Sequence, residues 1–235
     1  MEITGKIHIL FEQSGTFKHA FADEGYTAID YDIENNFGET DYVVNIFNEI
    51  DNFLFQGSET IFDDMKKEDL VMAFFPCTYF CENNNLIFTA QHANMHDKTI
   101  VENLRTIESR ELKRAAYYVK LLQLCEIAEY RGLRLIIENP YSANHYLYNN
   151  FPYKPSVAYY DRRRYGDAYK KPTQFFFINC EPGNNETAQR PCKPKHVETD
   201  NGFNRSIISK GFAKHFVIDR ILSKPKKLTQ LSFFK

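Results

Sequence analysis

The sequence predicts an α/β fold, with a Rossmann-like, mostly parallel sheet that carries helices on both faces. Short runs of β-branched and aromatic residues alternate with longer segments of helical period, which is typical of βαβ units. The chain has 235 residues, enough for one such domain with a buried core and too few for a second large one. We therefore expect a single domain over residues 1–235.

Six short apolar runs have the length and composition of strands. Their order along the chain, with helical segments between them, is the order that parallel pairing requires. The expected strands are residues 6–10, 26–31, 42–46, 70–75, 133–138 and 174–178.

The longest helical pattern lies between the fourth and fifth expected strands. In it Leu112, Ala116 and Val119 recur at helical spacing, and Arg131 followed by Gly132 predicts where the helix ends. A last helix is expected over residues 209–222. Residues 182–204 are rich in Pro, Gly, Asn and charge and predict an inserted loop, and residues 225–235 predict a C-terminal tail.

Charge and cysteine content restrict the class of protein. The formal net charge of -2 gives no overall attraction to a polyanion, so contact with nucleic acid depends on local basic clusters such as residues 162–164 and 170–171. The chain has 5 cysteines, an odd number, and neither a signal peptide nor a long apolar run. We expect free thiols, a cytoplasmic protein and no contact with membranes.

Chemically useful residues follow four of the expected strands. Ser14 and Gly15 follow the first strand, Asp32 follows the second, Cys77 follows the fourth, and Glu138 ends the fifth. In open α/β sheets the carboxyl ends of the strands face one crevice, where ligands bind. The sequence therefore predicts that a flexible turn, a thiol and two carboxyl groups meet in one site.

At these residues the sequence resembles the cytosine carbon-5 DNA methyltransferase family, in particular its short phage-type members. Residues 10–32 resemble the first two motifs of the family, and residues 75–80 its Pro-Cys motif. Residues 138–140 resemble the Glu-Asn motif, residues 165–173 the later basic motif, and residues 204–207 the closing Asn-Ser motif. The resemblance implies a class I S-adenosylmethionine-dependent methyltransferase that acts on DNA.

The resemblance also implies roles for individual residues. Cys77 would add to carbon 6 of the cytosine, Glu138 would bind the ring nitrogen and amino group, and Lys171 or Arg164 would favour the thiolate. Asn139, Pro140, Arg162 and Thr173 would contact the substrate. Binding of S-adenosylmethionine would fall to Phe11, Ser14, Gly15, Thr16, Asp32, Asn45, Pro76, Asn204 and Ser206, with Glu49 as a further candidate beside adenine.

The sequence departs from the family pattern in ways that leave a second function open. Glu12 and Gln13 occupy a turn that is rich in glycine in standard members, and Lys171 and Thr173 stand where spaced arginines would fall. Only residues 182–204 are available in place of a target-recognition domain. Single-stranded DNA is therefore a possible target. A catalytically silent, methyltransferase-like protein that binds DNA or a partner, such as a phage counter-defence factor, is the alternative.

Two further patterns are weaker. A mixed metal site can be drawn from Cys77, Cys81, Cys180, Cys192 and His196, but its spacing lacks the usual hairpin, and we expect no metal. The tail residues Gln230, Leu231, Phe233 and Phe234 resemble the short peptide by which bacterial DNA-processing proteins dock on the sliding clamp. The clamp is therefore a candidate partner.

Overall fold

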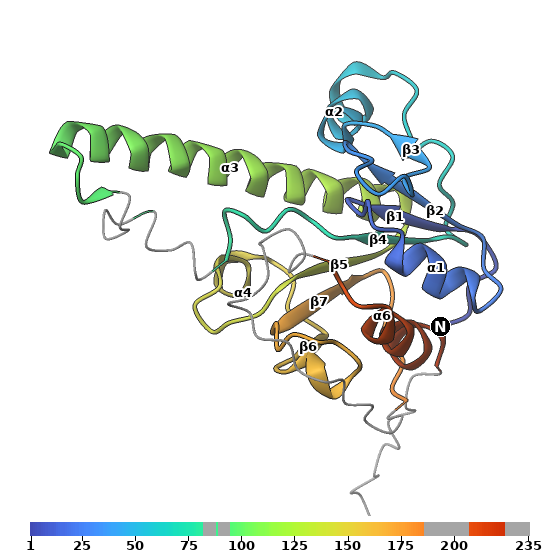
Figure 1. Ribbon diagram of the computed structural model, residues 1–235. Coiled ribbons are helices and arrows are strands. Elements are labelled where there is room, and N and C mark those ends of the chain that lie inside the picture. Colours follow the sequence, from blue (N-terminus) through green and yellow to red (C-terminus); the bar gives the residue numbers. More distant parts are fainter. Residues whose placement is uncertain (82–87, 89–94, 186–206, 224–235) are drawn as a thin grey trace, which may run out of the picture.

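A computed structural model describes residues 1–81, 88, 95–185 and 207–223 of the chain. Within this part, seven strands form one sheet in the order β3-β2-β1-β4-β5-β7-β6 (Figure 1). The strands are β1 (Ile7–Leu10), β2 (Ala28–Asp32), β3 (Tyr42–Val43), β4 (Leu70–Ala73), β5 (Arg134–Pro140), β6 (Val157–Tyr159) and β7 (Thr173–Ile178).

The sheet is mostly parallel. The pairs β1–β2, β2–β3, β1–β4 and β4–β5 are all parallel, whereas β7 runs antiparallel to both β5 and β6. The first five strands follow the 3-2-1-4-5 order of doubly wound sheets. The predicted α/β class is therefore confirmed, and the sheet is consistent with a Rossmann-like fold.

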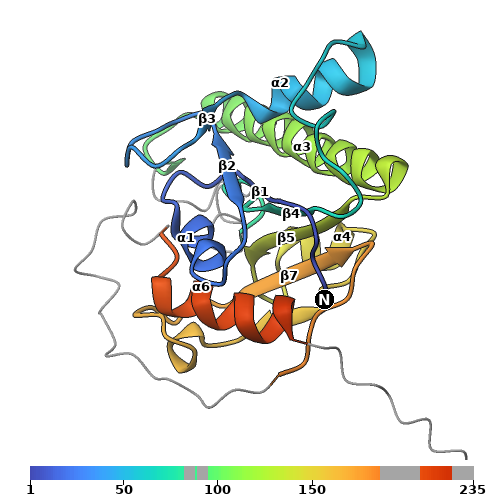
Figure 2. The same ribbon diagram turned by 90° about the vertical axis from the view of Figure 1, so that its right-hand side faces the viewer.

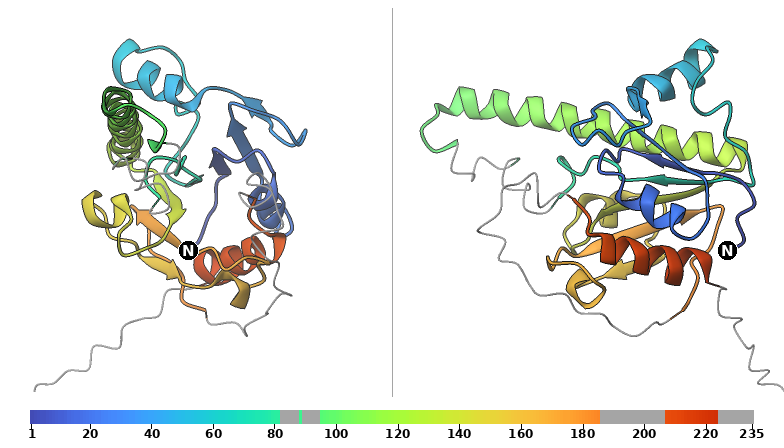
Figure 3. Two further views of the ribbon diagram at one scale, coloured as in Figure 1. Left: turned by 60° about the vertical axis from the view of Figure 1, so that its left-hand side comes forward. Right: turned by 45° about the vertical axis from the view of Figure 1, so that its right-hand side comes forward.

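Helices cover both faces of the sheet, as Figures 2 and 3 show. Helices α1 (Thr16–Ala22) and α6 (Lys210–Phe216) cover one face, where Phe17, Phe175 and Phe216 are fully buried in one core. Helices α2 (Ile46–Asp51), α3 (Ile100–Arg131) and α4 (Tyr146–Asn150) lie on the other face around a second core. This two-sided burial explains the continuous apolar runs of the central strands.

Helix α3 is the longest element, and its ends follow from the sequence. Thr99 and Glu102 form a reciprocal capping box at its start, and Gly132 ends it in the left-handed conformation with φ 63°. Its buried residues all lie between Leu121 and Ala128. The N-terminal part of the helix projects beyond the sheet (Figure 1).

The structure corrects several expected boundaries. Strand β6 was not predicted, because it has only three residues and follows a segment rich in Pro and Tyr. Strand β3 has two residues rather than the five expected, since Asn45 turns the chain into α2. The expected last helix is α6 continued by a π-helical segment over Val217–Leu222.

The predicted loop at residues 182–204 and tail at 225–235 fall largely or wholly outside the described residues. Among the residues that are described, no helix is long and apolar enough to cross a membrane.

Candidate functional site

A large cavity opens at the carboxyl ends of the parallel strands, at the point where the strand order reverses between β1 and β4. Its volume is about 1070 Å³, which is enough for a nucleoside-sized cofactor together with a nucleobase. The segments that follow β1, β2, β4 and β5 line it, and so does the segment that leads into β7. The predicted site residues in its lining are Phe11, Ser14, Asp32, Pro76, Cys77, Glu138, Pro140, Arg162, Lys171 and Thr173.

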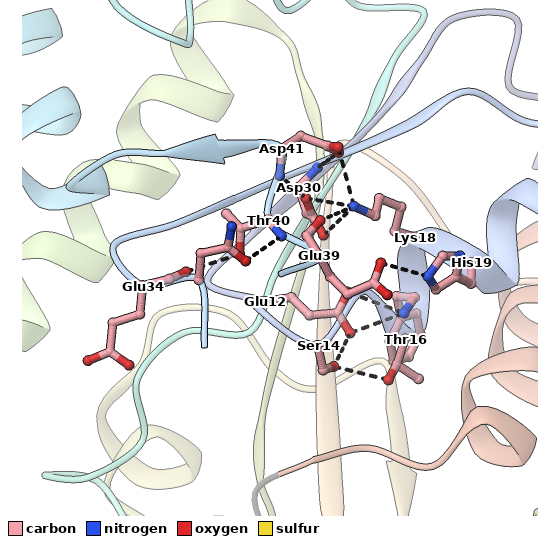
Figure 4. Close-up of polar contacts among 12 residues, drawn as sticks. Glu12, Ser14, Thr16, Lys18, His19, Asp30, Glu34, Glu39, Thr40 and Asp41 are labelled. Atoms are coloured by element: carbon pink, nitrogen blue, oxygen red, sulfur yellow. Dashed lines mark hydrogen bonds and ion pairs between the residues drawn. The ribbon is translucent and has the colours of Figure 1, made fainter. Parts of the chain in front are cut away.

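The turn after β1 is built around the carboxyl group of Glu12 (Figure 4). Its two oxygens accept the backbone N–H of Phe17 at 3.0 and 3.2 Å, and one also accepts the Ser14 hydroxyl at 3.2 Å. Burial raises the pKa of Glu12 to about 7. Glu12, which departs from the glycine-rich turn of standard members, therefore binds a backbone N–H group in the first turn of helix α1.

Two backbone positions in this turn have a left-handed conformation. Gly15, at the N-cap of α1, has φ 64°, and a Cβ there would stand 3.1 Å from a carboxylate oxygen of Glu39. Phe11 has φ 63° although it carries an aromatic side chain, which is costly for such a residue. Its ring lies 5.3 Å from that of Phe75, so packing against the end of β4 supports this conformation.

Asp32 ends β2 at the cavity and accepts the backbone N–H of Glu34 at 2.9 Å. Burial raises the pKa of this carboxyl group. Ile33 and Phe37, which follow it, line the cavity while 60% and 38% of their surfaces stay exposed. A carboxylate beside exposed apolar side chains suits a sugar hydroxyl next to a flat ring.

A second set of polar contacts surrounds Asp30, which lies within β2 (Figure 4). Asp30 is fully buried and accepts the backbone N–H of Asp41 at 2.7 Å. The Lys18 ammonium of α1 lies 3.1 Å from Asp30 and 3.3 Å from Asp41. These contacts tie α1, β2 and the following loop together, so the position of Asp32 is set by the fold.

Cys77 and Cys81 lie one turn apart in the segment after β4, and both line the cavity. The backbone N–H of Cys81 donates to the carbonyl of Cys77 at 3.2 Å. The Cys81 thiol also hydrogen-bonds the Cys77 sulfur, which lowers the pKa of Cys77 and raises that of Cys81. Of the two thiols, Cys77 is therefore the one that loses its proton more readily.

Glu138 and Lys171 face the same space as Cys77. Burial raises the pKa of Glu138, against the opposing effect of the positive charges on Arg162 and Lys171. Burial also lowers the pKa of Lys171, whose backbone is left-handed with φ 23°. The charge of Lys171 favours the Cys77 thiolate and that of Glu138 opposes it, so the three groups act on one another.

Arg162 is a buried guanidinium at the floor of this region. It donates to Asp167 at 2.8 Å and to the Thr173 hydroxyl at 3.3 Å, and only 2% of its side chain is exposed. Its central carbon lies 4.6 Å from the ring centre of Phe212. Arg162 was expected to contact substrate. Its guanidinium instead hydrogen-bonds Asp167 and Thr173, and its positive charge acts on Glu138 in the cavity.

The structure separates some predicted site residues from the cavity. Asn139 is fully buried and donates to the carbonyl of Phe75 at 2.9 Å, which joins the ends of β4 and β5. The side chain of Asn45 caps α2, and Glu49 accepts the backbone N–H of Ile61. Neither of these two adenine candidates is in the lining of the cavity. Gly15, Thr16 and Arg164 are also absent from the lining.

Other predicted residues cannot be placed. Asn204, Ser206, Gln230, Leu231, Phe233 and Phe234 lie outside the described residues, as do Cys192 and His196. Within the described part of the chain, His, Cys, Asp and Glu side chains form no cluster able to hold a metal ion. Cys180 follows β7, which runs antiparallel, and so lies at the opposite edge of the sheet from Cys77.

The sequence interpretation gave no catalytic or binding role to several residues that line the cavity. Glu12 was noted only as a departure from a glycine-rich turn, and Cys81 only as a possible metal ligand. Tyr141 and His145 follow the Glu138 motif and also line the cavity. Only Glu12 carried a usable signal, because an acid before a helix start is a common cap.

No known family model matches this chain, and no curated protein sequence matches it either. The assignment of function therefore rests on the geometry of the site and on the motif resemblance.

Proposed function

We propose that the protein transfers a methyl group from S-adenosylmethionine to carbon 5 of cytosine in DNA, through a covalent bond between Cys77 and the base. One observation carries the proposal. A thiol with a lowered pKa and a carboxyl group with a raised pKa line the same cavity, next to a carboxylate at the end of β2. These are the groups that the chemistry requires.

The cofactor half of the cavity favours S-adenosylmethionine over a dinucleotide. In dinucleotide-binding folds, the start of the first helix binds the pyrophosphate through its backbone N–H groups. Here the carboxyl group of Glu12 accepts the N–H of Phe17 at that position. A phosphate would meet a carboxyl group there, whereas S-adenosylmethionine has no phosphate.

Residues of the other strand ends fit the rest of this cofactor. Asp32 is placed to accept the ribose hydroxyls, and the exposed side chains of Ile33 and Phe37 offer an apolar surface for adenine. When bound, S-adenosylmethionine supplies an electrophilic methyl group. Phe11 and Pro76 line the space between the adenosine end and Cys77.

Cytosine carbon 5 is a weak nucleophile and needs activation. The Cys77 thiolate forms a bond to carbon 6 while the ring nitrogen takes a proton from Glu138, which leaves an enamine over the amino nitrogen, carbon 4 and carbon 5. Carbon 5 then takes the methyl group, and S-adenosylhomocysteine leaves. Loss of the carbon 5 proton to water breaks the bond between sulfur and carbon 6, the ring nitrogen returns its proton to Glu138, and the thiolate is restored.

Glu138 and Lys171 support this addition. A carboxyl group with a raised pKa is protonated often enough to donate to the ring nitrogen, where negative charge develops, and it also accepts from the amino group. Lys171 provides a positive charge that favours the attacking thiolate. The spaced arginines of the standard motif are thus replaced by Lys171 and the field of buried Arg162.

Methyl transfer from labelled S-adenosylmethionine to single-stranded DNA, duplex DNA and RNA tests the proposal. We expect label in DNA with the wild-type protein and none with Cys77→Ala. Cys125→Ala is the matched control, because Cys125 is a buried thiol of α3 outside the cavity. Equal labelling by wild type and Cys77→Ala would refute the role of Cys77.

The silent DNA- or partner-binding protein is the second candidate, favoured by the filled turn at Glu12. It predicts no stabilisation by S-adenosylmethionine in a thermal unfolding assay. A functional cofactor site predicts a rise in the free energy of unfolding of about 2.7 kcal/mol at a concentration of about 100 times Kd. Stabilisation that Asp32→Ala removes would favour the enzyme.

A further inference from the structure

Three tyrosines, of which Tyr160 is exposed and Tyr141 and Tyr148 are half-buried, form a cluster that reaches the cavity at Tyr141. The ring centre of Tyr141 lies 5.5 Å from that of Tyr148 and 5.2 Å from that of Tyr160, and both pairs are edge-to-face. The side chain of Tyr141 also hydrogen-bonds those of Tyr160 and Tyr148. We call Tyr141, Tyr148 and Tyr160 the tyrosine cluster.

The cluster is assembled from three separate segments. Tyr141 directly follows β5, Tyr148 belongs to α4, and Tyr160 directly follows β6. The backbone N–H of Tyr141 donates to the carbonyl of Pro172 at 2.9 Å, which joins the cluster to the segment before β7. The rings are therefore held in place by the fold while Tyr160 keeps 67% of its surface exposed.

The cluster is continuous with the catalytic part of the cavity. Tyr141 lines the cavity together with Glu138, Pro140 and Lys171. A base bound between Cys77 and Glu138 would therefore have its chain neighbours next to these rings. Rings at the mouth of a base pocket are suited to the bases on either side of the target.

Positive charge accompanies the rings. Arg164 and Lys170 are exposed and belong to the connection that starts at Tyr160, within which the backbone N–H of Arg162 donates to the carbonyl of Lys170 at 2.8 Å. The nearby Asp161 is paired with Arg163 at 2.6 Å, and Asp167 is buried against Arg162. No ion pair of Arg164 or Lys170 is found among the described residues.

Exposed aromatic rings flanked by unpaired cations are typical of surfaces that bind single strands. The rings stack on unpaired bases, and the cations contact the phosphates between them. In a duplex the neighbouring bases stay stacked on one another, so the rings have nothing to stack on. The tyrosine cluster therefore fits a single strand rather than a duplex.

We propose that the tyrosine cluster, with Arg164 and Lys170, binds single-stranded DNA on either side of the target cytosine. The inference rests on the proposed function for the identity of the target base, but the binding it describes needs neither cofactor nor methyl transfer. Arg164, which lies outside the cavity, acquires a role at the phosphates in place of the one expected at the base.

The test is fluorescence anisotropy with a labelled oligonucleotide of about 12 nucleotides that contains one cytosine, a length within the range that such surfaces bind. The same sequence as a duplex and as RNA forms the other two arms. We expect the single-stranded DNA to bind on the order of tenfold more tightly than the duplex. Equal or tighter binding of the duplex or of the RNA would overturn the proposal.

Substitutions assign the binding to the cluster. Tyr160→Ala should weaken binding of the single strand roughly tenfold, as loss of one stacked base predicts, while Tyr160→Phe should retain it. Tyr130→Ala is the matched control, because Tyr130 lies in the last turn of α3 with 82% of its surface exposed. Unchanged affinity of Tyr160→Ala, with an unchanged circular dichroism spectrum, would refute the stacking role.

A charge variant provides an independent arm. Arg164→Gln should lower the slope of log affinity against log salt concentration by about 0.7, the value for one phosphate contact to a single strand. An unchanged slope would remove Arg164 from the surface. The Cys77→Ala protein should bind the single strand like wild type. Wild-type protein that binds the single strand but transfers no methyl group would contradict the proposed function and leave this inference standing.

Discussion

The two halves of the cavity are held together in different ways. At the ends of β1 and β2, Glu12 and Asp30 accept backbone N–H groups and fix the turn and the neighbouring loop. At the ends of β4 and β5 and the start of β7, Cys77, Glu138, Lys171 and Arg162 interact through charge in a buried space. The first half is held by hydrogen bonds to backbone groups. The second half holds interacting charges in a buried space, an arrangement that the proposed chemistry uses.

This difference predicts that substitutions in the second half change the rate of reaction more than the shape of the site. Glu138→Gln should lower the single-turnover rate of methyl transfer by about 10²- to 10⁴-fold, the usual contribution of an acid–base group. Glu126→Gln, at an exposed acid of α3, is the control. A rate within a few-fold of wild type would show that Glu138 does not act on the base.

The buried ion pair should be the most sensitive point for stability. Arg162→Met leaves the carboxylate of Asp167 buried without its partner, which costs about 3–5 kcal/mol in the free energy of unfolding. Arg163→Met removes an ion pair that is largely solvated and should have a much smaller effect. Denaturant unfolding measures both variants, and similar losses for the two would contradict the comparison.

The half of the cavity that contains Glu12 should show its own dependence of stability on pH. The pKa of Glu12 is raised from an ordinary 4.5 to about 7, so between these values the folded state holds a proton that the unfolded state has lost. The contribution of Glu12 is therefore fully present below about pH 4.5 and is lost as pH rises to about 7, by up to about 3 kcal/mol.

Glu12→Gln should remove this dependence, because an amide keeps an acceptor for Phe17 and does not titrate. Unfolding of wild type and variant across this pH range measures the difference, in which the contributions of the other carboxyl groups cancel. Parallel curves for the two proteins would place the pKa of Glu12 in its ordinary range.

The smallest effect should appear at the thiol pair. Cys81→Ala removes the hydrogen bond that lowers the pKa of Cys77, so the alkylation rate of Cys77 should rise at higher pH than in wild type. Cys81→Ser retains a donor and should stay close to wild type. Mass spectrometry of the Cys77 peptide after iodoacetamide treatment follows the change, and identical profiles for all three proteins would argue against it.

Much of the fold was predictable because its signals are local. The apolar runs identified every strand except β6, and Arg131 followed by Gly132 marked the end of α3. Strand β6 has three residues and, within the described part of the chain, pairs with β7 alone, so its existence depends on tertiary contacts.

The sequence predicted the position of a site residue only where that residue directly follows or ends a parallel strand. Asp32, Cys77 and Glu138 were brought to the cavity by the rule that parallel strands share one edge. Asn45 was expected beside adenine, but its side chain caps α2. The sequence alone does not distinguish the two roles, because an Asn side chain serves both. Tyr141 and Tyr160 are far apart in sequence, and only the antiparallel pairing of β6 with β7 and of β7 with β5 brings them together.

The direction of β7 has a consequence for how this architecture can diversify. Since β6 ends and β7 begins at the same edge, the whole connection over residues 160–172 closes one hairpin at the mouth of the cavity. Lengthening such a connection costs little loop entropy and leaves every strand register unchanged. An insertion at an exposed position of this connection therefore changes the mouth of the cavity without moving the strands that carry Cys77 and Glu138.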